Sequence, residues 1–227
     1  MSATANVTGL PTPAPSDPLP LVKQWLDAAS ALERRNPNAM ALATTGANGH
    51  PSVRMVLLRG LAVNDGYAVF YTHYASRKAV ELQSSGRAAA VLYWEDLGRQ
   101  IRFEGAVLRS PAAESDAYFA TRPWRSQLNA WSSEQSKPLA DPTDLTLRAA
   151  LKAREFGLGD DQTPPARGQT LPRPDFWGGF RLWFDTVELW VEGADRFHER
   201  LRYTRGLTPA DAFSFRSGAW THQRLQP

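Results

Sequence analysis

The chain contains no cysteine, and this absence excludes several kinds of chemistry. Disulfide bonds, thiolate nucleophiles and thiolate metal sites are ruled out, and the composition fits a reducing compartment. The only histidines are His50, His73, His198 and His222, and none of their spacings is typical of a metal site. We therefore expect no metal ion in the protein's function.

Long apolar runs and long basic runs are also missing. No stretch approaches the roughly 18 apolar residues that cross a bilayer, and the first twenty residues hold neither Lys nor Arg, unlike a secretory signal. The 26 Lys and Arg are scattered among 23 Asp and Glu, so no basic stripe is formed. The sequence predicts a cytoplasmic protein that binds small anions, with neither nucleic acid nor a membrane as partner.

The patterns that are present predict one domain, mainly β with flanking helices. With 227 residues, 42% of them hydrophobic, the chain can bury a substantial core. We expect residues 1–16, rich in Ala, Thr and Pro, to form a disordered arm before a folded domain over 17–227. About six short strands joined mostly by tight turns favour an antiparallel barrel. The expected strands are 39–44, 53–59, 67–72, 88–94, 100–108, 180–191, 200–203 and 219–225, and the expected helices 17–35, 76–84, 111–121 and 145–155.

Two cations stand where the helix over 76–84 is expected to begin. Arg77 and Lys78 oppose the positive end of the helix dipole there, unless an anion such as a phosphate occupies the same place. Arg54, Tyr71 and Thr72 are further candidate donors to that anion. The alternative is a frayed helix end with two solvated side chains, because dipole penalties of this size are commonly tolerated.

A second candidate anion clamp follows in the chain. Tyr118 and Arg122 are four residues apart and share a helix face, and Ser126 lies just beyond Pro123, where we expect the helix to stop. A phenol, a guanidinium and a hydroxyl that converge can bind an oxyanion. The alternative is an amphipathic helix in which Tyr118 is half buried and Arg122 extends toward solvent.

A third group of polar residues lies near the C-terminus. In an extended chain Arg196, His198 and Arg200 point to the same side, which places an imidazole between two cations. This arrangement favours an anionic, oxidisable ligand, whereas a solvated edge strand is the alternative. Three neutral polar residues, Gln100, Gln135 and Ser136, sit beside apolar or aromatic neighbours and could meet the edge of a heteroaromatic ring.

Together these segments resemble one family, the pyridoxamine 5'-phosphate oxidases. The resemblance covers residues 17–227 and implies a Greek-key split β-barrel homodimer with FMN at the subunit interface. It further implies an oxidase that passes a hydride from a small anionic ring substrate to the flavin and then to O2, giving H2O2. The matching segments are Arg54–Arg59, Val69–Thr72, Ser76–Lys78, Arg99–Gln100, Tyr118–Pro123, Trp131–Ser136, Phe176–Gly179 and Arg196–Arg200.

Carried over by position, the resemblance assigns roles to individual residues. His198 and Arg196 would orient the substrate, and either could assist removal of a proton. The expected flavin contacts are Arg54, Met55, Val56, Leu57, Leu58, Arg59, Tyr71, Thr72, Arg77, Lys78, Gln100, Gln135, Ser136, Trp190 and Arg200. The expected substrate contacts are Arg59, Tyr118, Arg122, Ser126, Arg196 and His198. Arg54 and Arg59 are an odd number of residues apart, so we expect a bulge, or the sites of two subunits, to bring them to one ligand.

The resemblance leaves the substrate open between two branches of the family. The arm lacks the Arg-x-x-Tyr that pyridoxal-phosphate-forming members usually carry, Arg59 replaces their Lys, and Val191 replaces their Gln. Segments such as Leu171–Asp175 and His198–Tyr203 resemble the phenazine-biosynthesis oxidases, which favours late oxidation of dihydro- or tetrahydrophenazine carboxylates. The alternative is oxidation of pyridoxine or pyridoxamine 5'-phosphate, for which Tyr118, Arg122 and Ser126 are suited. A non-catalytic flavin- or pyridoxal-phosphate-binding protein is a third hypothesis.

Overall fold

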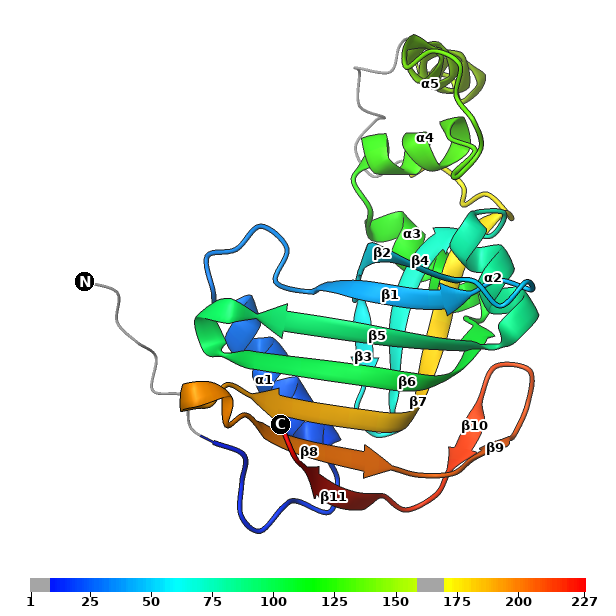
Figure 1. The fold of residues 1–227 in the computed structure, drawn as a ribbon. Helices are drawn as coiled ribbons and strands as arrows, with labels where there is room; N and C mark the ends of the chain where they lie inside the picture. The colour runs from blue at the N-terminus through cyan, green and yellow to red at the C-terminus, as the bar shows by residue number, and fades with distance from the viewer. Residues whose placement is uncertain (1–8, 159–169) are drawn as a thin grey trace.

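The fold is one curled antiparallel sheet flanked by helices, as the computed structural model of residues 9–158 and 170–227 shows (Figure 1). The strand order is β11-β8-β7-β6-β5-β1-β2, and β4 joins β3 to β7. The strands of this sheet are β1 (Ala39–Thr45), β2 (Pro51–Leu57), β3 (Gly60–Ala62), β4 (Tyr67–His73), β5 (Arg87–Trp94), β6 (Arg99–Arg109), β7 (Trp177–Val191), β8 (Glu199–Thr204) and β11 (Thr221–Leu225). The short strands β9 (Leu207–Pro209) and β10 (Phe215–Ser217) form a separate pair.

The prediction of a mainly β fold with flanking helices is therefore confirmed, and all eight expected strand segments are present, although a barrel of about six strands underestimates the sheet. The described residues form nine strands in the main sheet and two in the small one. The sequence missed β3, β9 and β10, because three residues are too few to show the alternation of a half-buried strand.

The curl of the sheet centres on β7, the longest strand of the structure. Its first half pairs with β4 and its second half pairs with β8, while β6 runs along both halves. The register between β6 and β7 shifts at Glu104 and Gly105, and a Cβ on Gly105 would lie only 1.8 Å from the carbonyl oxygen of Trp183. Glycine is required at this bulge, and the bulge bends the strand pair so that the sheet closes into a half-barrel.

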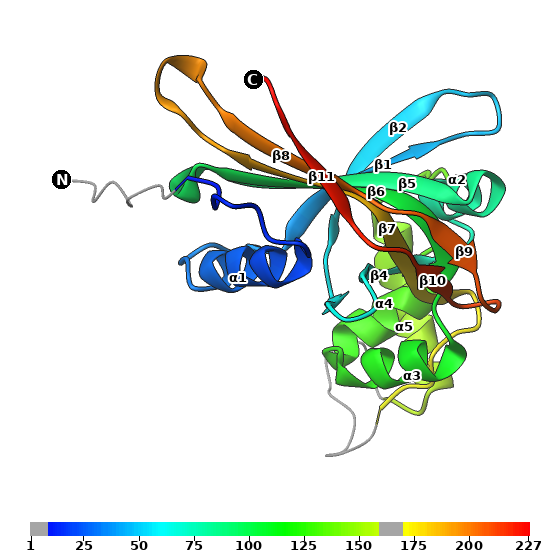
Figure 2. The ribbon, with the colours of Figure 1, turned by 90° about the horizontal axis from the view of Figure 1, so that it is seen from below.

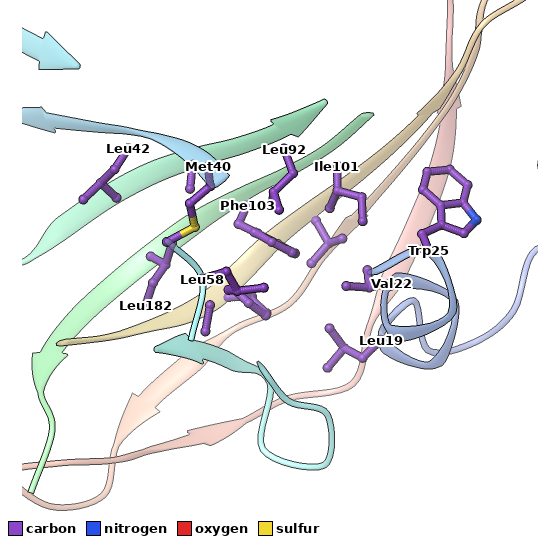
Figure 3. Packing of buried hydrophobic residues seen from close by; sticks show 14 of the residues in the cluster. Leu19, Val22, Trp25, Met40, Leu42, Leu58, Leu92, Ile101, Phe103 and Leu182 are labelled. Atoms are coloured by element: carbon purple, nitrogen blue, oxygen red, sulfur yellow. The ribbon is translucent and has the colours of Figure 1, made fainter. Parts of the chain in front are cut away.

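The core lies inside this curl, as the alternation of the strands predicts. Inward-facing side chains of β1, β5 and β6 are almost fully buried, and helix α1 (Leu19–Ser30) covers them from one side (Figure 3). The expected helix over 17–35 is present but shorter: Pro18 rather than Asp17 is its N-cap, and it ends at Ser30, while the Asp17 carboxylate accepts a hydrogen bond of 2.9 Å from the Leu19 N–H. The labelled core residues are Leu19, Val22, Trp25, Met40, Leu42, Leu58, Leu92, Ile101, Phe103 and Leu182.

Most of the other helices form a lobe at one end of the sheet (Figure 1). The lobe comprises α3 (Ala112–Thr121), α4 (Trp124–Ser132) and α5 (Thr143–Glu155), while α2 (Arg77–Ser85) packs against β1. A small core of Leu128, Ala153, Leu158 and Leu171 holds α4 to α5. The sequence missed α4, because we expected Pro123 to end a helix and the structure shows it beginning the next one.

The N-terminal segment differs from the prediction of a disordered arm over 1–16. Leu10 is only 6% exposed, and Ala14 packs against the main core, so part of residues 9–16 is fixed to the domain. Residues 1–8 lie outside the described residues. Among the described helices none is long and apolar enough to cross a membrane.

Candidate active site

An open pocket of about 290 Å³ lies between the sheet and the helical lobe. Strands β2 and β4 form one side of it, and α2, α3, α4 and the start of β7 supply the rest. It contains ten of the residues that the sequence singled out, namely Met55, Val56, Leu57, Arg59, Tyr71, Thr72, Lys78, Tyr118, Arg122 and Gln135. It also contains His73, Asn129, Ala130, Ser133 and Trp177, which the sequence analysis did not identify.

Lys78 places a buried ammonium group in this pocket. The residue is only 8% exposed, and its Nζ donates to Gln135 Oε1 (3.0 Å) and Thr72 Oγ1 (3.1 Å). Burial, with a smaller contribution from the charge of Arg54, lowers the pKa of Lys78 to about 8. Within the described part of the chain no carboxylate lies within 4 Å of this ammonium. A buried cation with only neutral partners is a ready site for an anion.

Two further cations stand near Lys78 and share one buried carboxylate. Glu81 accepts hydrogen bonds from Thr44 (2.5 Å), Ser52 (2.6 Å), Arg77 (2.8 Å) and Arg54 (3.2 Å). Burial alone would raise the pKa of Glu81, but these hydrogen bonds outweigh burial and lower the pKa to about 2. Glu81 is therefore ionised at every working pH and holds the two guanidinium groups in place. One signal of this contact is visible in the sequence, because Glu81 lies four residues after Arg77 on α2.

Stacked aromatic rings form the opposite wall of the pocket. The rings of Tyr71 and Tyr118 stack at 3.9 Å, and Trp177 stacks on Tyr71 at 5.4 Å. Burial raises the pKa of Tyr71, so this phenol stays protonated. The Arg122 guanidinium lies 4.5 Å from the Trp177 ring, and its buried Nη1 has no hydrogen-bond partner among the described residues. The Arg59 guanidinium lies over the Tyr118 ring, 5.9 Å from its centre.

The break between β2 and β3 places Arg59 in the pocket lining, whereas Arg54 on β2 lies outside it. Strand β2 ends at Leu57, and the chain then leaves β1 so that the Arg59 N–H donates to Val69 O of β4 (2.8 Å). This change of strand partner interrupts the alternation between the two arginines, and the expectation that a bulge or the sites of two subunits bring them to one ligand stays a prediction.

Five of the expected contacts lie outside the lining of this pocket. Arg54 and Arg77 lie beside it, where both pair with Glu81. Leu58 faces the core rather than the pocket and is buried there. Ser126 lies in the first turn of α4, where its N–H donates to Pro123 O. Ser136, at a φ of 73°, lines a neighbouring pocket together with Gln135.

The remaining expected site residues form a second cluster at the far end of β7. Gln100, Trp190 and Arg200 are direct neighbours across β6, β7 and β8. The His198 ring lies 4.6 Å from the Trp190 ring, and Arg200 is held by Glu188 through Nε (2.9 Å) and Nη2 (2.8 Å). Arg196 is exposed in the short turn before β8.

The two clusters lie far apart within one chain. Trp177 lines the pocket at the first residue of β7, and Trp190 stands near the last residue of this 15-residue strand. At ~3.3 Å per residue an extended strand of this length spans roughly 45 Å, which exceeds the reach of one small ligand even after allowance for the bend. Figure 2 shows the tip of the β7–β8 hairpin and the helical lobe at opposite ends of the molecule.

Comparison with known proteins identifies the family of the chain. A family model described as "Pyridoxamine 5'-phosphate oxidase" matches residues 26–155, and one described as "Pyridoxine 5'-phosphate oxidase C-terminal dimerisation region" matches residues 177–227. The chain belongs to the pyridoxamine 5'-phosphate oxidase family. It is accordingly an oxidoreductase of a flavin-binding family, and Trp190, His198 and Arg200 of the second cluster lie within the matched dimerisation region.

Curated relatives in this family carry one common name. A protein of Cereibacter sphaeroides is 44% identical over 94% of this chain and 96% of its own length. A protein of Burkholderia multivorans is 41% identical over 94% of this chain and 91% of its own length. Both are named pyridoxine/pyridoxamine 5'-phosphate oxidase. Among solved structures, PhzG from Burkholderia lata, in complex with tetrahydrophenazine-1-carboxylic acid, matches with a TM-score of 0.81. It is 31% identical and covers 99% of this chain and 100% of its own.

Proposed function

We propose that the protein binds FMN in the pocket described above, with the phosphate at Lys78, Arg54 and Arg77. Three cations stand there against the single carboxylate of Glu81, so two positive charges remain for a phosphate dianion. One such group argues for FMN over FAD, since the chain has no Gly-rich turn for a dinucleotide. The neutral partners of Lys78 support the same assignment, because they leave its charge uncompensated.

We further propose that the working unit is a homodimer with flavin sites between the subunits. The separation of the two clusters along β7 requires a second copy to bring Gln100, Trp190 and Arg200 to the flavin. Exposed apolar side chains on the outer face of the sheet, including Val53, Met55 and Tyr93, support a subunit contact there. The matched dimerisation region supports the same arrangement.

The pocket best supports a phosphate ester as substrate, and pyridoxine or pyridoxamine 5'-phosphate is the class that we propose. One observation carries this choice: the pocket holds two guanidinium groups, that of Arg122, whose buried Nη1 has no partner among the described residues, and that of Arg59, which lies over the Tyr118 ring. Two guanidinium groups in one pocket suit a dianion better than a single carboxylate. The 41–44% identical relatives support this choice over the phenazine carboxylates that the sequence analysis favoured.

The chain's own residues hold and orient the reactants. Arg59, Tyr118 and Arg122 anchor the substrate's anionic group, while Arg196 and His198 of the second copy approach the ring, where the His198 imidazole can take up a proton. When bound, FMN would accept a hydride from the substrate and pass the electrons to O2, giving H2O2.

A reduced phenazine carboxylate is the second candidate substrate. The structural match to PhzG in complex with tetrahydrophenazine-1-carboxylic acid favours it, as does the flat wall of stacked rings at Tyr71, Tyr118 and Trp177.

Anaerobic stopped-flow reduction of the bound flavin compares the two substrate classes directly. We expect rapid bleaching with pyridoxine 5'-phosphate and slow bleaching with dihydro- or tetrahydrophenazine carboxylate. The opposite order would assign the enzyme to phenazine oxidation, and no bleaching with either would favour a non-catalytic binding protein.

The lowered pKa of Lys78 predicts that FMN affinity falls as the pH rises above about 8. Only the protonated amine attracts the phosphate, and the free protein loses this proton above a pKa of about 8. Titration of the apoprotein with FMN, followed by flavin fluorescence, should show the dissociation constant increasing between about pH 8 and pH 10. Riboflavin has no phosphate and is the control, and an equal pH dependence for both ligands would contradict the role of Lys78.

A further inference from the structure

The turn that carries Arg196 and His198 has a strained backbone. Asp195 and Arg196 both have positive φ values, 53° and 67°, which residues with a Cβ seldom adopt. The His198 ring contacts the Trp190 ring at 4.6 Å, but Phe197, between the two expected catalytic residues, is 77% exposed and contributes little packing. Within the turn a hydrogen bond of 3.3 Å joins the Gly193 N–H to His198 Nδ1. Such a conformation persists only where neighbouring structure enforces it.

The next residue along the chain, Glu199, is bound to two segments from the opposite ends of the sequence. Its Oε2 accepts a hydrogen bond from the Leu10 N–H (3.1 Å) and pairs with Arg224 Nη1 (3.3 Å). Arg224 also donates through Nη2 to Thr12 Oγ1 (2.8 Å) and to Pro11 O (3.0 Å). The segment Gly9–Thr12, which we name the strap, is therefore fastened to both β8 and β11.

The strap packs closely against the rest of the domain. The Leu10 side chain is buried in the main core. A Cβ on Gly9 would lie 2.2 Å from Glu199 Oε1, so only glycine fits at this position while Glu199 keeps its contacts. The strap contains no Arg and no Tyr, and its hydrogen bonds described here go to Glu199 of β8 and Arg224 of β11.

Arg200 is held mainly from the other side. Its Nε and Nη2 donate to the buried Glu188 across the sheet, while its Nη1 donates to Gln226 O (3.1 Å) just beyond β11. The two bonds to Glu188 do not involve the strap, so they can keep this arginine in place when the strap is removed.

We propose that Glu199 is a positioning residue, which fixes the strained turn before β8 by holding the strap and Arg224. Through this turn it sets the place of Arg196 and His198. The role of these two residues rests on the proposed function, whereas the ordering of the turn does not. The strap, which we expected to belong to a disordered arm, thus supports the site.

Amide hydrogen exchange, read by mass spectrometry in the peptide that contains residues 193–198, tests the ordering directly. Deletion of residues 1–12 removes the strap, deletion of residues 1–8 keeps it, and Glu199→Gln retains the size of the side chain but loses the ion pair. We expect exchange to be at least about fivefold faster in the 1–12 deletion and in Glu199→Gln than in the wild type and the 1–8 deletion. Equal exchange in all four proteins would overturn the proposal.

Steady-state kinetics then separate positioning from a general loss of structure. With FMN saturating, Glu199→Gln should lower kcat by about tenfold, the size expected for one charge-assisted contact. KM should stay within about threefold, because Arg59 and Arg122 lie in the other cluster, and the FMN dissociation constant should also be unchanged. If the 1–12 deletion fails to fold, Arg224→Met is the substitute variant. A rise in KM or loss of FMN with unchanged kcat would contradict the positioning role, while a wild type that takes up no flavin would refute the proposed function alone.

Discussion

Lys78→Met should weaken FMN binding by about 100-fold, because it removes a charge-assisted contact from a buried site. The methionine keeps much of the volume of the lysine stem, so the pocket should stay filled and the fold intact. The dissociation constant is measured by quenching of flavin fluorescence on titration of the apoprotein.

Arg77→Met is the matched control for this variant. The Arg77 side chain is 64% exposed and already paired with Glu81, so its loss should cost about tenfold or less. Riboflavin affinity should be the same in both variants and in the wild type. FMN binding by Lys78→Met within about threefold of the wild type would place the phosphate elsewhere.

Arg122→Met should lower kcat/KM for pyridoxine 5'-phosphate by at least about 100-fold while the bound flavin is retained. Arg122 offers a buried Nη1 without a protein partner, and an anion that meets it gains a hydrogen bond at little desolvation cost. Burial lowers the pKa of Arg122, but a guanidinium remains charged at neutral pH.

Two neighbours of Arg122 serve as controls. Arg125→Met changes an exposed residue of the same helical region outside the pocket, and Ser126→Ala removes the hydroxyl that the structure leaves outside the pocket lining. Both should keep kcat/KM within about threefold. A loss in Ser126→Ala as large as that in Arg122→Met would show that the clamp has a different geometry when substrate is bound.

The sequence predicted the local structure well where one face of an element is buried. Alternation along residues 100–108 correctly predicted β6, and the apolar spacing after Asp17 correctly predicted the start of α1. These patterns are local, since a strand or helix shows its buried face through its own side-chain period. The placement of Arg77 and Lys78 at the start of α2 followed from the same local reasoning.

Contacts between distant segments could not be predicted in this way. Arg54 meets Glu81 only because β2 and α2 pack together, and Glu199 meets Leu10 and Arg224 from the two ends of the chain. Trp177 was missed because the sequence analysis began the strand at Phe180, whereas pairing with β4 extends it through Gly178 and Gly179. A residue's own neighbours along the chain carry no information on such partners.

The division of the site between two copies is the central claim, and subunit complementation tests it most directly. Arg122→Met and His198→Ala each damage one cluster, and a mixed dimer purified through two different tags carries one intact site if the clusters come from different subunits. We predict that the mixed dimer recovers about half of the wild-type kcat/KM, although each variant alone is severely impaired. A mixed dimer no more active than the average of its two parents would contradict a site shared between subunits.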